Sequence, residues 1–171
     1  EGVKTFLGET GNWNGEDIIN IICKQPSCAR FISRHLYNFF VADDVEVAQW
    51  QGTPPRDPEA IQMLEKAFVE SNYEIRAVLR VLFNSDFFKN ARFAKVKSPA
   101  EVVVGTMRLV QDYTTPKHGM HPIASETRYM GQDMMDPPTV EGWHTGKEWI
   151  DSGTLVERIN FVAEQVGNTD L

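Results

Sequence analysis

The chain has 171 residues, of which 42% are hydrophobic, and 17 Lys and Arg against 24 Asp and Glu give a formal net charge of -7. This apolar content excludes a disordered chain, and the length suits one compact unit with a real core. The acidic balance, without clusters of Lys or Arg, argues against nucleic acid as the main partner, because phosphate neutralisation needs a basic surface. No apolar run approaches the roughly 18 residues of a membrane span, and the first residues lack the pattern of a signal peptide. We therefore expect a single helical domain over residues 1–171.

Two helices are predicted in the N-terminal part of the chain. The first begins after a cap at Asn14 or Gly15, and Pro26 ends it. Ser27 caps the second, whose continuous apolar stripe makes it the expected core helix. Before these helices, only residues 4–7 have an extended pattern.

Two cysteines, Cys23 and Cys28, flank the junction between these helices. Three interpretations are open: small buried apolar residues beside a helix junction, which we favour, a disulfide, for which the spacing is suitable, or a metal site. Two cysteines do not fix the redox compartment.

The segment 42–57 breaks the helical pattern with paired aspartates and a run of Gly and Pro residues. We expect a loop here with one short helical turn at most, as an insertion or a flap. Asp57 and Pro58 then give a cap and a first-position proline to a helix that reaches about Ser71, and a further helix spans 73–83.

The strongest local signal is the capping box Ser98-Pro99-Ala100-Glu101, which starts a helix that we expect to reach Tyr113. A loop should follow over 114–124. A short helix from Ser125 to about Met135 comes next in the prediction.

A Trp-containing loop is expected over 136–152, rich in Pro and Gly. The last helix, about 153–166, carries one apolar seam, made of Leu155, Ile159, Val162 and Val166. The fold class is therefore all-α: an irregular helical bundle of about six to seven helices with long loops.

Several segments read together carry a family resemblance. In chain order they are Lys4–Gly8, Gln25–Phe31, Phe39–Val41, Ile75–Phe83, Lys97–Glu101, Met130–Gln132, Pro137–Trp143, Trp149–Ile150 and Arg158–Phe161. In this order, and over nearly the whole chain, they resemble the C-terminal part of the bacterial domain of unknown function 1800 family.

The resemblance implies a location and partners but no chemistry. Members of the family are longer, so it implies that an N-terminal helical portion precedes this region in the whole protein. No activity is established for the family, so no catalytic residue can be transferred. It also implies an exported protein of the periplasm, the cell surface or the extracellular space. Other protein subunits are the expected partners, among them a sulfatase-like neighbour protein.

The loop 136–152 holds the candidate ligand-binding residues. Trp143, His144 and Trp149 stand between glycines, and exposed indoles beside polar groups are the surfaces on which sugars stack. Apolar plugs that anchor a long loop have the same sequence pattern. We favour anchoring and keep glycan or cell-wall binding as the alternative.

No cofactor is expected, although two metal hypotheses stay open. His118 and His121 could share zinc with His144 or a carboxylate, because imidazole is a common metal ligand. The loop containing Asn12, Asn14 and Asp17 resembles the first half of a calcium loop, but it lacks the closing bidentate glutamate. A glycine-rich turn that ends in a helix cap is the favoured alternative.

Six arginines lie on predicted helices near acidic residues: Arg30, Arg34, Arg76, Arg80, Arg108 and Arg158. We expect mainly internal ion pairs, with an anion pocket as the alternative. Nucleophile elbows and phosphate-binding glycine loops are missing from this sequence. We expect an interaction or scaffold module of an envelope or surface assembly. The alternative is the C-terminal part of an enzyme on envelope polymers or glycans, so enzyme status is open.

Overall fold

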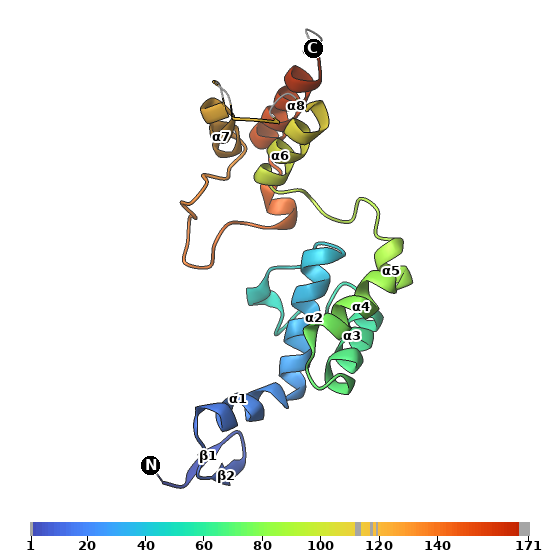
Figure 1. Ribbon diagram of the computed structural model, residues 1–171, viewed down its shortest axis with the longest axis vertical. Coiled ribbons are helices and arrows are strands. Elements are labelled where there is room, and N and C mark those ends of the chain that lie inside the picture. The colour runs from blue at the N-terminus through green and yellow to red at the C-terminus, as the bar shows by residue number, and fades with distance from the viewer. Residues whose placement is uncertain (1, 112–113, 117, 119, 168–171) are drawn as a thin grey trace. The chain divides into compact units, whose positions relative to one another are not determined.

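The computed structural model describes residues 2–111, 114–116, 118 and 120–167, and it is mainly helical (Figure 1). Eight α-helices lie in these residues, beside two three-residue strands and two 3-10 helices, which confirms the all-α class. The contacts group the chain into two compact units, residues 1–94 and 95–171, where the sequence led us to expect one domain. Each unit has its own buried apolar cluster. None of the described helices combines the length and the hydrophobicity that a membrane crossing requires.

Unit 1 begins with a β-hairpin. Strand β1 (Lys4–Phe6) pairs with β2 (Glu9–Gly11) in antiparallel register. Leu7 and Gly8 form the turn with φ of 48° and 84°, and two consecutive positive φ values are the mark of a tight hairpin turn that twists with its strands. The sequence predicted the first strand only, because Glu-Thr-Gly has no apolar alternation of its own.

Helices α1 (Gly15–Cys23) and α2 (Pro26–Phe40) follow. Asn14 caps α1, as predicted, and its side chain accepts a hydrogen bond from the backbone N–H of Asp17. Pro26 was expected to end the first helix, but it begins the second, because proline at the first helical position needs no N–H partner.

Both thiols at this junction are free. Cys23 and Cys28 are half-buried. Burial raises the pKa of the Cys28 thiol, and the neighbouring Cys23 raises it further. The raised pKa leaves little thiolate on Cys28, which therefore behaves as a small apolar residue in this structure.

The core of unit 1 lies between α2, α3 (Pro58–Glu70) and α4 (Ile75–Asn84), with the short α5 (Asp86–Lys89) beside them (Figure 1). Its least exposed apolar side chains are Ile61, Leu64, Val78 and Leu82. Asp57 caps α3, as predicted from the Asp-Pro pair.

The segment 42–57 forms no α-helix and holds only a 3-10 turn, Val47–Gln49. A buried arginine of α2 fastens this segment. Arg34 donates from Nε to Asp44 Oδ2 over 2.7 Å, and both side chains are nearly inaccessible. Its terminal nitrogens donate to the backbone carbonyls of Trp50, Thr53 and Pro54. Arg34 therefore closes the segment onto α2.

Unit 2 contains α6 (Pro99–Val110), α7 (Met120–Tyr129), a 3-10 turn (Gly146–Trp149) and α8 (Ser152–Gly167). Helix α6 packs against both α7 and α8. The buried cluster is small, with Val103 from α6, Met130 after α7 and Phe161 from α8. The predicted capping box at Ser98 and Glu101 is present in both of its hydrogen bonds.

Helix α7 starts and ends earlier than predicted, at Met120 and Tyr129 rather than at Ser125 and Met135. Pro122 lies in its first turn, where a missing N–H costs nothing, so a proline read as loop is helical. Gly131, with φ of 96°, ends the helix. The N–H of the next residue, Gln132, bonds to the Thr127 carbonyl over 2.7 Å, which completes a Schellman cap.

Candidate functional site

Helix α8 has an inner face and an apolar seam that do not coincide. The inner face consists of two buried residues, Arg158 and Phe161, and two half-buried residues, Thr154 and Gln165. Each seam residue directly follows one of these four, so the seam is rotated by roughly 100° from the inner face. The exposed fractions of Leu155, Ile159, Val162 and Val166 are 43, 58, 37 and 52%. The seam that the sequence predicts is therefore left largely open.

A shallow groove of about 710 Å³ runs beside the seam, between α8 and the start of α6. Val102 from α6 and Ile159, Val162 and Val166 from α8 form most of its apolar wall. Arg158 is the one charged residue that lines it in the described part of the chain. An open apolar surface of this kind marks an interaction site more often than a catalytic one.

Arg158 is 8% exposed and has few partners. Its Nη1 donates to the backbone carbonyl of Lys97 over 2.7 Å. Nε and Nη2 are both buried and have no hydrogen-bond partner among the described residues. Burial lowers the pKa of this guanidinium. Since no described carboxylate forms an ion pair with it, the site is a buried cation with two free donors.

The surroundings of Arg158 fix its position. The Lys97 carbonyl directly precedes Ser98, the cap of α6, so the acceptor sits at a rigid helix start. The amide of Gln132 accepts from the Ala100 N–H over 2.9 Å and holds the same turn from the other side. Phe161, one turn further along α8, is anchored in the core. The guanidinium is therefore held by the fold.

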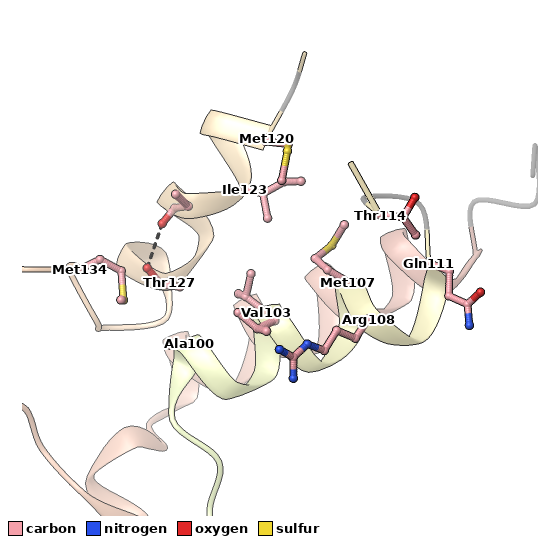
Figure 2. Close-up of a pocket in the computed structure, with 12 residues that line it drawn as sticks. Ala100, Val103, Met107, Arg108, Gln111, Thr114, Met120, Ile123, Thr127 and Met134 are labelled. Atoms are coloured by element: carbon pink, nitrogen blue, oxygen red, sulfur yellow. Dashed lines mark hydrogen bonds between the residues drawn. The ribbon is translucent and has the colours of Figure 1, made fainter. Parts of the chain in front are cut away.

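A second, more enclosed pocket of about 550 Å³ lies between α6 and α7 (Figure 2). Figure 2 shows Val103 and Met107 from α6 opposite Ile123 and Met120 from α7. Most of the lining is apolar, and the Thr127 hydroxyl already donates to the Ala124 carbonyl. The size suits a small apolar ligand, but the pocket lacks grouped titratable side chains in its described lining.

The two tryptophans of the 136–152 loop are inward residues. Trp149 is 5% exposed, and Trp143 is half-buried, with its indole N–H donating to the Asp133 carbonyl over 3.2 Å. His144 is exposed, and its Nδ1 lies 3.6 Å from Glu148 Oε1. In this structure the indoles anchor the loop, the alternative that the sequence favours. Glycan binding at Trp143, His144 and Trp149 stays a prediction.

The predicted metal ligands either lie outside any cluster of ligands in the described residues or form hydrogen bonds with the backbone. His118 and His121 are exposed, and within residues 2–111, 114–116, 118 and 120–167 no three His, Cys, Asp or Glu side chains gather as a metal site would require. Asn14 and Asp17 bond to each other's backbone as the cap of α1, and Asn12 is exposed. The zinc and calcium hypotheses stay predictions.

Sequence reasoning grouped the helical arginines together, and the structure separates them. Arg30 pairs with Glu65 on the surface over 3.1 Å, and Arg34 is buried with a full set of partners. Arg158 differs from both because its Nε and Nη2 are buried and unpaired. The signal in the sequence was its position one residue before the seam, on the face that also carries Phe161.

Comparison with known proteins identifies the family. Residues 1–168 match the family described as "Protein of unknown function (DUF1800)". No curated protein and no solved structure matches the chain. Because the match covers nearly the whole sequence, the chain belongs to the DUF1800 family.

Proposed function

We propose that this region is a protein-interaction module that binds another polypeptide through the seam of α8, as part of an exported envelope or surface assembly. The observation that supports the binding role is the seam itself. Four aliphatic side chains at helical spacing stay between 37 and 58% exposed while the adjacent face of the same helix is buried. Contiguous exposed apolar surface of this kind often marks an interaction site.

The energetics suit a reversible contact. Fully burying an aliphatic side chain is worth roughly 1.5–3 kcal/mol, so covering the exposed remainder of four yields on the order of 4 kcal/mol before the costs of association. This gain alone supports weak binding. A partner must add area or a specific polar contact to bind tightly.

The enzymatic alternative requires a concave polar pocket with grouped titratable residues. The pocket between α6 and α7 is apolar, and its one charged lining residue among those described, Arg108, is exposed. The geometry therefore favours binding over chemistry in this region. The exported location follows from the family resemblance, and fractionation of the source bacterium tests it directly: the protein should accompany the envelope or the medium, and a cytosolic protein would contradict it.

Photo-cross-linking in the source bacterium tests the binding role. A photoreactive amino acid replaces Ile159 or Val166 in the full-length protein, and Asn160, an exposed polar position of the same helix, serves as the control. The same second polypeptide should be captured from both seam positions and not from Asn160. Cross-links that stay within the chain itself, or equal capture from Asn160, would contradict the proposal.

A further inference from the structure

The unpaired edge of Arg158 calls for a ligand of defined shape. Nε and Nη2 are neighbours on one side of the planar guanidinium, and both lack a partner in the described residues. Together they present two parallel N–H donors, the edge that takes a carboxylate in a bidentate pair. Leaving a buried charged donor unpaired is costly, and such groups in native proteins usually have a function.

The groove selects a carboxylate over a phosphate. Arg158 supplies one positive charge, and the other lining residues in the described chain are aliphatic or glycine. A single carboxylate is neutralised by this charge, and both of its oxygens are bonded. A phosphate would keep a second charge and further oxygens against an apolar wall, where nothing compensates them.

The shape of the surface indicates a helix as the carrier of that carboxylate. The seam follows the i, i+4, i+7, i+11 spacing of a helical face and extends over roughly 16 Å, beside a groove that is open rather than enclosed. An amphipathic helix laid along such a groove is a recurrent mode of recognition. A compact small molecule would contact only one end of the seam.

We propose that Arg158 receives the carboxylate of an Asp or Glu from an apolar helix of a partner polypeptide that docks along the α8 seam. This inference rests on the proposed function and adds the chemistry of the partner. Nε and Nη2 are closed to solvent in the free protein. Docking therefore has to uncover these two nitrogens, and the carboxylate then exchanges water for the guanidinium.

Selection from a displayed library of random helical peptides tests the apolar docking and the acidic contact with Arg158 separately. Against the wild-type protein, selected sequences should carry apolar residues at helical spacing and one Asp or Glu at a fixed position among them. Against Arg158→Met, the apolar pattern should persist and the acidic residue should be lost. Arg108→Met, which removes an exposed arginine outside the groove, should select the same peptides as wild type.

Affinity then gives the size of the effect. A selected peptide should bind wild type roughly ten- to a hundredfold more tightly than its Glu→Gln twin, as expected for a charge-assisted bidentate pair. Arg158→Lys keeps the positive charge but loses the two parallel N–H donors. It should therefore lose most of the preference for the Glu peptide over the Gln peptide, and this test holds even if Arg158→Met fails to fold. Selected peptides with apolar anchors but no acidic preference would overturn this inference and leave the proposed function standing. Peptides without any apolar helical pattern would overturn both.

Discussion

Two buried arginines, one in each unit, show how the same side chain serves different purposes. Arg34 in unit 1 uses all three nitrogens, on Asp44 and on the carbonyls of the 42–57 segment, and its guanidinium lies 4.6 Å from the Trp50 ring. Arg158 in unit 2 uses only Nη1, on the Lys97 carbonyl. Both are almost fully buried. Burial alone therefore does not identify a structural arginine, and the count of satisfied donors does.

The largest loss of stability should appear when the Arg34 side chain is removed. Arg34→Met leaves the buried Asp44 carboxylate without its cation and releases the carbonyls of the 42–57 segment. We expect a loss of about 3–5 kcal/mol in the free energy of unfolding, measured by urea denaturation. Arg30→Met is the matched control, because Arg30 is 69% exposed in its pair with Glu65 and should cost at most about 1 kcal/mol. Equal losses in the two variants would contradict the structural role of Arg34.

Substitutions on the two faces of α8 should differ by a similar amount in the free energy of unfolding that they remove. Phe161→Ala removes a buried ring from the small core of unit 2 and should cost about 3–5 kcal/mol. Ile159→Ala, on the seam, should cost less than about 1 kcal/mol because the side chain is 58% exposed. Thermal or urea unfolding measures both. A large loss from Ile159→Ala would mean that the seam belongs to the core.

Arg158→Met should leave the fold intact, in contrast to Arg34→Met. It removes one hydrogen bond to Lys97, but it also removes a buried charge that no described carboxylate compensates. Replacing such a charge by an apolar side chain is often neutral or stabilising, so the free energy of unfolding should stay within about 1 kcal/mol of wild type or rise. A loss above about 3 kcal/mol in urea denaturation would place Arg158 with Arg34 as a structural residue.

The smallest expected effect is a pH dependence of the free energy of unfolding, which comes from His35, the residue next to Arg34 in sequence. His35 packs against Trp50 with ring centroids 4.6 Å apart, and burial lowers its pKa. In the unfolded chain, His35 takes up a proton near pH 6.5, whereas in the folded chain it does so at lower pH. Between these two pKa values the unfolded chain therefore binds more protons than the folded chain. The free energy of unfolding should therefore be constant above about pH 7 in this respect and fall as pH decreases through 6.5. Comparison with His35→Phe isolates the contribution, and identical pH slopes would contradict it.

Local signals in the sequence were sufficient for three of the helix starts. The caps at Asn14, Asp57 and Ser98 are all present, because a cap is decided by neighbouring residues. Proline misled twice, at Pro26 and Pro122, since it begins helices as readily as it ends them.

Long-range features could not be read in the same way. The seam of α8 is correct as a helical pattern, yet the helix packs through the face one residue away. The partners of the packed face are distant in sequence: Phe161 lies in the buried cluster with Val103 and Met130, and Arg158 bonds to the Lys97 carbonyl, 61 positions away. The unpaired edge of Arg158 is likewise a property of the tertiary structure, because the residue type predicts only that partners are needed.

The carboxylate-binding role of Arg158 is tested by observing the Nε–H groups of both arginines by nitrogen–proton NMR, with the signals assigned through Arg34→Lys and Arg158→Lys. On addition of a selected acidic helical peptide, the Arg158 Nε–H signal should shift downfield as it bonds to the carboxylate, and the Glu→Gln twin should not produce this shift. The Arg34 signal, already bonded to Asp44, should stay in place. An unchanged Arg158 signal on binding, or the same shift with the Gln peptide, would contradict the assignment of Arg158 as a carboxylate receptor.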